Sequence, residues 1–308
     1  MSGGRLALAF DTSNYTTSCA YFDGERGENS GRLLDVPAGA LGLRQSEALF
    51  SHVKRLPEIM EALKPQGPVA AVGASTKPRE TEDSYMPCFL AGASQAQVLA
   101  SVMGVPFFPF SHQQGHIAAA AYSAGRPELL ETEHLAWHLS GGTTELLLVR
   151  PMGVAVWCEI IGGTTDVSAG QLIDRTGLAL GLRFPAGKEL DSLSERAEKR
   201  EFYRPKADGL RFSLSGVEHK MKQRVEAGDA PEDTAYFALR SMIGAVQAAT
   251  EAAKRKYGDL PVLYSGGVAS NSLLRSLTPE GVFAPPKYST DNAYGVAVLT
   301  YRAVTANG

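Results

Sequence analysis

The sequence predicts an α/β protein built from two related lobes, each a mixed β-sheet flanked by helices. Three observations support this prediction. Short apolar runs typical of strands alternate with longer segments whose apolar residues recur near every 3.6 positions. A pattern of strand, polar turn and strand occurs twice, about 130 residues apart, which indicates a duplicated unit. At 308 residues the chain also exceeds the length that one hydrophobic core usually serves.

The first copy of this pattern begins with an apolar strand at residues 5–10. A polar turn, DTSNYTT, covers Asp11–Thr17 and leads into a returning strand, SCAYFDG. The second copy reads LAWHL, SGGTTE and LLLVR over residues 135–150, and a further apolar stretch, VAVWCEIIGG, follows it. Because both copies share one plan, we expect the two lobes to contain similar sheets.

Three other segments show the apolar spacing of helices. SEALFSHVKRLPEIMEALK contains Pro57, where we expect the helix to break. GASQAQVLASVMG ends at Gly104, a typical helix stop. DTAYFALRSMIGAVQAATEAAKRKYG is a long amphipathic helix that ends in a basic turn and Gly258, as the helix dipole favours. LPVLYSGGVASNSLLRSL then supplies a buried strand, a double-glycine turn and a helix.

We expect the boundary between the lobes in the segment SAGRPELLETE, residues 123–133. The first lobe would cover residues 1–125, with the last helix, 292–308, returning to it, and the second lobe would cover 132–291. A hydrophobic content of 44% and a charged content of 20% are typical of a soluble globular protein. No window approaches 18 apolar residues, so we expect no membrane span.

Charge and cysteine content narrow the possible partners and compartment. The net charge of −3 gives no overall attraction to nucleic acid, so RNA binding would need a local basic patch or a helper protein. Residues 204–224 are the best local candidate, although such a segment is more commonly a solvated face. The three cysteines show no pairing pattern, which favours a reducing cytoplasm.

The stretch SHQQGHIAAAA places His112 and His116 four residues apart at the start of a helix-favouring run. On a helix these positions share one face, so two imidazoles could converge on one cation. Two ligands make an incomplete site, and a zinc protease needs Glu where this chain has Gln113. From the residues alone the pair is either a set of metal ligands or two histidines on an ordinary packed helix.

Three turns rich in glycine or hydroxyl residues follow apolar strands, at Asp11–Thr17, Ser140–Thr144 and Ser265–Asn271. Glycine lets the backbone approach a phosphate closely, and the free N–H groups of a turn attract its charge. A single turn of this kind is often only a tight β-turn. Two facing turns in a duplicated protein favour a nucleotide held in a cleft between the lobes, although no P-loop is present.

Three aspartates have positions suited to chemistry. Asp174 emerges from an apolar helix, and Asp191 lies on the next helix after a PAG turn. Both could accept ribose hydroxyls or orient a metal-bound water, but a helix cap or an ion pair with Arg175 or Arg183 is an equally good interpretation. Asp291 precedes a helix of small residues, where aspartate is usually a cap.

Taken in order, seven motifs resemble the TsaD/Kae/Gcp family, which belongs to the superfamily of actin, sugar kinases and Hsp70. The motifs are HQQGH, HLSGGTTEL, AGQLIDR, FPAGKELD, RFSLSG, SGGVASNSLLR and STDNAYG. This resemblance covers nearly the whole chain and implies an actin-like ATPase fold with a cleft between the lobes. It also implies transfer of a threonylcarbamoyl group from threonylcarbamoyl-AMP to the N6 amine of adenosine 37 in tRNA.

The resemblance implies a divalent iron or zinc ion held by His112, His116 and Asp291, which are also the expected catalytic residues. His138 lies where some members have a tyrosine ligand, and it could complete the metal site. The resemblance and the glycine turns together imply that ATP or threonylcarbamoyl-AMP is bound by Leu139, Ser140, Gly141, Gly142, Thr143, Asp174, Gly187, Asp191, Gly266, Gly267 and Asn271. It further implies a partner with an actin-like fold, of the TsaB type, that would dock on the helix at residues 46–63.

The chain departs from the family at positions near the expected chemistry. Tyr15 and Thr16 replace acidic residues, and Thr143 replaces a histidine. Glutamines 114 and 171 replace glutamates, PGG becomes PAG, and residues 75–89 replace a segment rich in glycine and proline. We interpret the chain as a divergent bacterial-type paralogue. Three hypotheses follow: a threonylcarbamoyltransferase, a carbamoyl transferase or ATPase with another acceptor, and a noncatalytic nucleotide-binding partner.

Overall fold

The computed structural model describes residues 5–13, 15–35 and 43–306. Asn14, in the first predicted turn, and the outer ends of the predicted lobes lie outside these residues. Contacts divide the chain into two compact units. The first unit comprises residues 1–132, 150–158 and 290–308, and the second comprises 133–149 and 159–289. Asp291 therefore belongs to the first unit, although our prediction placed it at the end of the second lobe.

The first unit contains a five-stranded sheet in the order β3-β2-β1-β4-β5. β1 pairs antiparallel with β2, and β2 with β3, whereas β1, β4 and β5 run parallel. The strands are β1 (Leu6–Ser13), β2 (Thr16–Phe22), β3 (Gly27–Leu33), β4 (Val69–Lys77) and β5 (Phe107–Ser111). The helices are α1 (Gln45–Leu63), α2 (Phe89–Met103), α3 (His112–Ser123), η1 (Pro127–Leu130) and α9 (Tyr294–Ala306).

The other sheet has seven strands in the order β12-β11-β6-β7-β8-β10-β9. Its strands are β6 (His134–Leu139), β7 (Thr144–Met152), β8 (Ala155–Thr164), β9 (Ala207–Asp208), β10 (Arg211–Phe212), β11 (Val262–Ser265) and β12 (Val282–Phe283). The helices of the second unit are α4 (Ala169–Ala179), α5 (Gly187–Ser194), α6 (Ser215–Glu226), α7 (Pro231–Tyr257), η2 (Gly267–Ser270), α8 (Ser272–Leu277) and η3 (Pro286–Tyr288).

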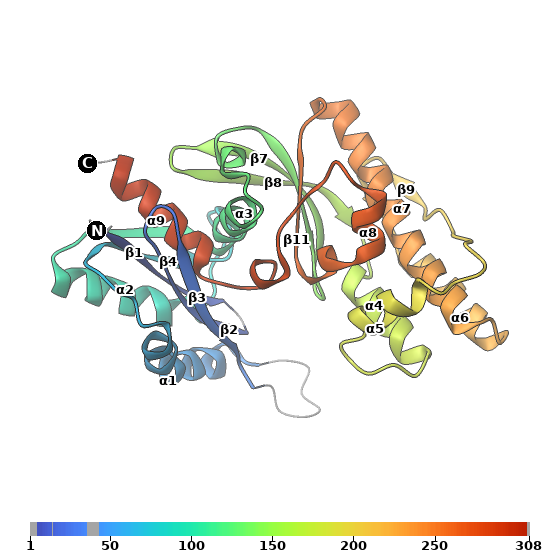
Figure 1. The fold of residues 1–308 in the computed structure, drawn as a ribbon, viewed down its shortest axis with the longest axis horizontal. Coiled ribbons are helices and arrows are strands. Elements are labelled where there is room, and N and C mark those ends of the chain that lie inside the picture. The colour runs from blue at the N-terminus through green and yellow to red at the C-terminus, as the bar shows by residue number, and fades with distance from the viewer. Residues whose placement is uncertain (1–4, 14, 36–42, 307–308) are drawn as a thin grey trace. The chain divides into compact units, whose positions relative to one another are not determined.

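The two sheets share one topology. The order β3-β2-β1-β4-β5 in the first sheet corresponds to β8-β7-β6-β11-β12 in the second, and β9 and β10 are additions beyond β8. In both sheets an antiparallel hairpin, β1–β2 or β6–β7, sits beside a parallel strand (Figure 1). This correspondence confirms the duplicated plan and the mixed α/β class that the sequence predicts.

Helix α1 corrects one prediction, because it continues through Pro57 without a break. Proline removes one N–H, which leaves the carbonyl of Val53 without its usual partner. Val53 and Pro57 both lie on the exposed side of the helix, where water can bind that carbonyl. The buried side carries Leu56, Ile59 and Leu63, whose packing holds the helix together.

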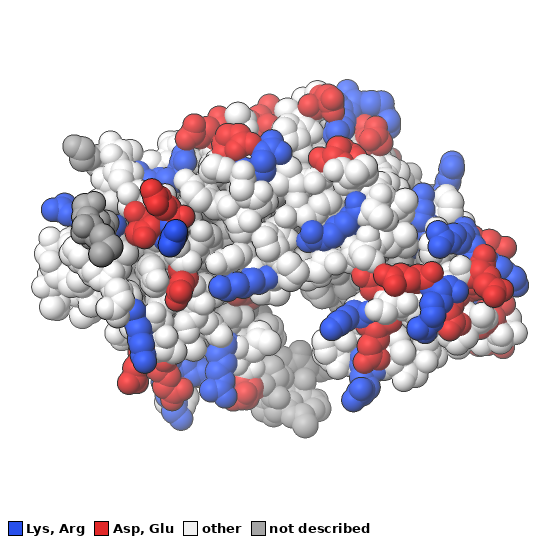
Figure 2. All heavy atoms as spheres, in the orientation of Figure 1, with Lys and Arg blue, Asp and Glu red and all other residues white. Residues whose placement is uncertain are grey.

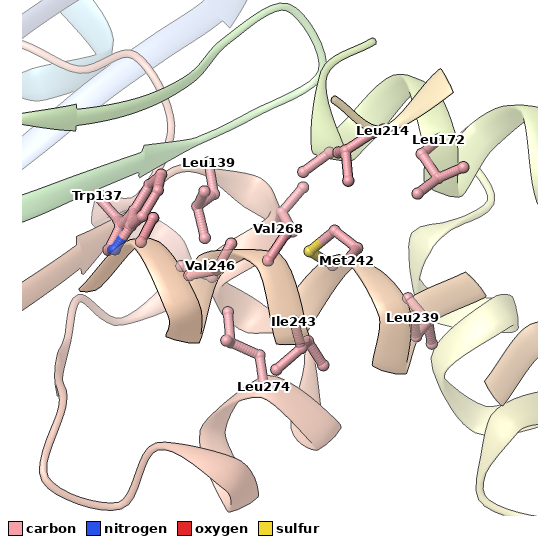
Figure 3. Packing of buried hydrophobic residues seen from close by; sticks show 14 of the residues in the cluster. Trp137, Leu139, Leu172, Leu214, Leu239, Met242, Ile243, Val246, Val268 and Leu274 are labelled. Carbon is pink, nitrogen blue, oxygen red and sulfur yellow. The ribbon is translucent and has the colours of Figure 1, made fainter. Parts of the chain in front are cut away.

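The long helix α7 forms the centre of the second unit's core. On this helix, Val246 lies toward Trp137 of β6, Met242 lies beside Val268 of η2, and Ile243 lies beside Leu274 of α8 (Figure 3). As the sequence predicts, α7 ends in a basic turn at Gly258, whose φ of 104° favours glycine.

Two connections differ from their predicted form. β1 extends to Ser13 and β2 begins at Thr16, so Asp11 is a buried strand residue and not part of the predicted polar turn. The expected linker at residues 123–133 contains η1, whose two leucines are fully buried. In both segments, burial against neighbouring elements overrides the polar character of the local sequence.

Among the described residues, no helix is both long and apolar enough to cross a membrane.

Candidate functional site

Helix α3 presents two histidines to one point because of how it begins. Ser111 ends β5 and caps the helix, since its hydroxyl accepts from the backbone N–H of Gln114. The Gln114 side chain accepts in return from the Ser111 N–H, which completes a capping box. His112 is thus the first helical residue, and His116 follows one turn later on the same face.

Asp291 reaches these histidines from the segment before α9. Gly295 of α9 lies directly against the α3 backbone, and a Cβ built on it would meet the Gly115 carbonyl oxygen at 1.8 Å. This close crossing brings the start of α9 beside the start of α3. Asn292, and not Asp291, accepts from the Tyr294 N–H over 3.0 Å. The Asp291 carboxylate is therefore available to the histidines.

Three donor atoms converge at this point. His116 Nε2 lies 2.9 Å from His112 Nε2 and 3.2 Å from Asp291 Oδ1. His112 Nε2 lies 3.6 Å from the same oxygen. All three atoms lie within 4.8 Å of one another, the arrangement expected of metal ligands. The three residues that the resemblance implied as ligands are thus neighbours within the first unit.

A second carboxylate, Asp11, stands behind His112. Its Oδ2 lies 2.7 Å from His112 Nδ1 and also accepts from the Ser75 hydroxyl. On the other side of the cluster, the Thr16 hydroxyl donates to Asp291 Oδ2 over 3.3 Å. Sequence reasoning assigned Asp11 only to a polar turn. The signal that could have identified it is an aspartate directly after an apolar strand, because such a carboxylate needs a partner if the strand continues into the core.

The charged groups of the cluster stabilise one another's ionised forms. Burial lowers the pKa of His112, but the attraction of Asp11, its hydrogen bond and the interactions with Asp291 raise this pKa to about 10. Burial raises the pKa values of Asp11 and Asp291, yet their contacts with His112 outweigh it and hold both below the ordinary value. Hydrogen bonds from both histidines make the lowering at Asp291 the larger one. The site therefore stabilises a positive charge between two carboxylates.

This donor set fits a divalent transition metal. Two imidazoles and one carboxylate, with further coordination positions open, are typical of non-haem iron(II) sites, and the same donors suit zinc. A cation bound by His112 Nε2 would take the place of the proton that this imidazole otherwise carries. The Asp11–His112 contact supplies the outer carboxylate that metal-binding histidines usually have.

In the second unit, the turn between β6 and β7 is fixed by the start of α4. Ser168, the N-cap residue, donates to the Gly141 carbonyl over 2.6 Å, and Gly170 N–H donates to the Ser140 carbonyl over 3.2 Å. A Cβ on Gly170 would meet Gly141 Cα at 2.5 Å, so only glycine permits this approach. The carbonyls of the turn thus face α4, and the exposed Gly141 and Gly142 have no Cβ to block a ligand.

Two other residues predicted to bind the nucleotide, Asp174 and Asp191, hold neighbouring helix starts. Asp191 of α5 accepts from the Asn271 side-chain amide over 2.7 Å, and Asn271 caps α8. Asp174 of α4 accepts from the Ala186 N–H over 2.9 Å, one residue before Gly187 begins α5. The end of β6 also lies close to the residue after β11. A Cβ on Gly266 would meet the Leu139 carbonyl oxygen at 2.1 Å. Gly267 then begins η2, and Thr143 closes the β6–β7 turn through its N–H to the Ser140 hydroxyl.

Two departures from the family have structural roles here. Gln114 and Gln171 both occupy the third helical position and accept from the N-cap N–H, at the starts of α3 and α4. The Gln114 amide also donates to the Val156 carbonyl over 2.9 Å, and so points away from the histidines. His138 lies on β6 in the second unit, so its predicted ligation of the metal stays a prediction.

Residues 85–298 match a family model described as TsaD, tRNA N6-adenosine threonylcarbamoyltransferase. The chain belongs to the TsaD family. It is 32% identical to the tRNA N6-adenosine threonylcarbamoyltransferase of Streptococcus pneumoniae, over 98% of this chain and 92% of that protein. TsaD proteins are thus its relatives over nearly the full length, and the chain is a member of a family of transferases.

Solved structures show that this TsaD-family chain has the actin-like ATPase fold. Full-length HypF, crystallised in a phosphate- and nucleotide-bound form, matches the whole chain with a TM-score of 0.60 and 14% identity. HypF from T. kodakarensis gives a TM-score of 0.57 at 14% identity, and the chain spans about half the length of both HypF proteins. The ROK hexokinase of Thermus thermophilus matches 98% of the chain and 99% of its own length, with a TM-score of 0.52 and 14% identity.

Proposed function

We propose that the chain transfers a threonylcarbamoyl group from threonylcarbamoyl-AMP to the N6 amine of adenosine 37 in tRNA, at a metal centre formed by His112, His116 and Asp291. The observation that carries the proposal is the convergence of these three donors in a member of the TsaD family. The proposed ligands come from two segments, the start of α3 and Asp291, and His116 and Asp291 lie 175 positions apart in sequence. An ordinary two-histidine helix does not require such a convergence.

The ligand residues have separable tasks. His112 and His116 supply neutral nitrogen donors from one helix face, and Asp291 supplies a charge that offsets part of the charge of a dication. A cation held by these residues would supply Lewis-acid chemistry, which would polarise the carbamoyl carbonyl and balance phosphate charge. The burial of His116 and Asp11 excludes water from one side of the cluster, which strengthens its electrostatic interactions.

The nucleotide would lie against the β6–β7 turn of the second unit. The exposed backbone of Gly141 and Gly142 suits a phosphate, and Asp174 and Asp191 would accept ribose hydroxyls. Each carboxylate already holds a neighbouring helix start, so its orientation is fixed before a ligand arrives. ATP and threonylcarbamoyl-AMP share the adenosine and α-phosphate that this arrangement would recognise.

Binding of tRNA requires help from outside this chain or from a local patch. Lys and Arg alternate with Asp and Glu among the described residues on the face in Figure 2. Within residues 204–224, Arg224 pairs with Glu201 and Asp229. In this described segment, Arg204 and Lys206 form no ion pair, so both can contact phosphate.

A partner of the TsaB type, with an actin-like fold, would dock on α1 and α2. α1 exposes Phe50 and Val53 three residues apart, and α2 exposes Val98 and Val102 four residues apart. The two helices pack against each other in the first unit. Exposed apolar side chains on both helices would suit contact with a second helical pair.

The proposal is tested in cells depleted of their own threonylcarbamoyltransferase. Expression of the chain should restore threonylcarbamoyladenosine in tRNA, measured by mass spectrometry of nucleosides, and His116→Ala should abolish the restoration. Absence of the modified nucleoside with the wild-type chain, despite normal expression, would contradict the proposed acceptor.

A further inference from the structure

The first hairpin, β1–β2, places two buried side chains against the ligands of the proposed metal centre. Asp11 lies on β1, and Thr16 is the first residue of β2. Asp11 contacts His112 at Nδ1, and Thr16 contacts Asp291 at Oδ2. Each contact involves the ligand atom outside the three-atom cluster, which uses His112 Nε2 and Asp291 Oδ1. The hairpin therefore contacts the outer atoms of two ligands.

We propose that Asp11 and Thr16 are positioning residues that present His112 and Asp291 to the metal, an inference that rests on the metal site proposed above. An ionised carboxylate can only accept a hydrogen bond, so Asp11 keeps a proton on His112 Nδ1. The Nε2 lone pair is then directed to the cation. Thr16 donates to Asp291 Oδ2 in the same way and leaves Oδ1 for the cation. Such partners fix ligand orientation and raise ligand basicity.

Asp11 is itself held in place by the sheet. Its Oδ1 accepts from the backbone N–H of Ser13 over 3.0 Å, and Ser75 of β4 donates to Oδ2. The side chain is fully buried, so rotation would leave a charged oxygen without a partner. The carboxylate is thus fixed before a metal binds, and its position sets that of the His112 ring.

The same contacts predict the effect of Asp11→Asn. The Ser13 N–H requires an acceptor, so the amide oxygen takes the Oδ1 position and the amide nitrogen faces His112. An amide nitrogen donates only, so His112 must accept at Nδ1 and carry its proton on Nε2. That tautomer cannot bind a metal through Nε2. The substitution replaces one carboxylate oxygen with an NH2 group of similar size. Its main effect is therefore to change the tautomer of His112.

The test is a zinc titration of the full-length protein, stripped with a chelator, against a competing chromophoric chelator. Asp11→Asn should weaken zinc binding about 10- to 100-fold. Thr16→Val should weaken it about 2- to 10-fold, as the loss of one hydrogen bond predicts. Asp166→Asn and Thr165→Val, which alter hydrogen-bonded side chains of the second unit, are matched controls and should bind zinc as the wild type does.

Nitrogen NMR of the zinc-loaded protein separates positioning from a purely structural role. In the wild type the His112 proton should reside on Nδ1, and in Asp11→Asn this signal should be lost while the fold persists. Unchanged zinc affinity in Asp11→Asn and Thr16→Val would overturn the inference and leave the metal site standing. A wild-type protein that binds no zinc would overturn the metal site itself, and the inference with it. If Asp11→Asn does not fold, the affinity of Thr16→Val decides between these outcomes.

Discussion

At the scale of single residues, two neighbouring side chains before α9 have different roles. Asn292 accepts from the Tyr294 N–H, and Asp291 binds the histidines of α3. The residue types alone allowed Asp291 to be either a cap or a ligand. Because Asn292 takes the capping role, the Asp291 carboxylate is left to contact the histidines. His112 likewise owes its chemistry to Asp11, which lies 101 positions earlier in the chain.

The raised pKa of His112 predicts how stability of the metal-free protein depends on pH. The folded-state pKa of about 10 lies above the ordinary value of 6.5, so the protonated form stabilises the fold. This stabilisation of the folded state by protonated His112 is fully present below about pH 6.5 and is lost as the pH rises to about 10. Urea unfolding in the presence of a chelator should show this loss between pH 7 and pH 10. His112→Gln should lack that part of the pH dependence, and an equal slope in both proteins would contradict the assignment.

The two capping glutamines predict opposite tolerance to glutamate. Gln114 is buried and donates to the Val156 carbonyl, so Gln114→Glu would place a carboxylate oxygen against a carbonyl oxygen. We expect it to lower the free energy of unfolding by about 1–3 kcal/mol at neutral pH. Gln171 is exposed and acts only through its oxygen, so Gln171→Glu should be close to neutral. Equal effects of the two changes in urea unfolding would contradict the role given to Gln114.

At the scale of elements, the site depends on the crossing of α3 and α9. Gly115 and Gly295 allow the two helices to approach closely, and the crossing brings Asp291, just before α9, to the histidines of α3. The β1–β2 hairpin then holds two of those ligands from the other side. In the second unit, the approach of Gly170 to the β6–β7 turn performs a similar task. In both units a helix start is fixed against its neighbour through glycine.

Gly295→Ala should separate α3 from α9. The added Cβ would lie 1.8 Å from the Gly115 carbonyl oxygen, which forces a backbone shift. Overpacking of this kind typically costs about 1–3 kcal/mol, and we expect zinc affinity to fall as well. Gly216→Ala in α6 is the control, because its Cβ would meet its nearest neighbour, Tyr203 Cε1, at an ordinary 3.7 Å. Thermal unfolding and zinc titration of both variants check this, and a Gly295→Ala protein with wild-type stability would contradict the close crossing.

At the scale of the whole molecule, the periodic features were predictable and the long-range contacts were not. The repeated strand, turn and strand pattern correctly indicated two sheets of one topology, and α7 followed from its apolar spacing and terminal Gly258. Pro57 misled the prediction, because the packing of Leu56 and Ile59 maintains α1.

The site was predictable only in part. Its three proposed ligands followed from the resemblance, whereas local patterns left each of them ambiguous. Asp11 was missed because its role depends on contacts with Ser75 and His112, and no local pattern records such pairings. The capping roles of Gln114 and Gln171 also required the observed helix starts. Tertiary contacts thus determine the chemistry of residues whose local sequence suggests only turns and caps.

The metal content of the protein as purified tests the central claim most directly. Elemental analysis should find one iron or zinc ion per chain in the wild type and in Asp208→Asn, a control at an exposed site of the second unit. Asp291→Asn, which removes the charged ligand of the cluster, should retain less than about a tenth of that metal. Equal metal content in the wild type and in Asp291→Asn would contradict a metal centre at His112, His116 and Asp291.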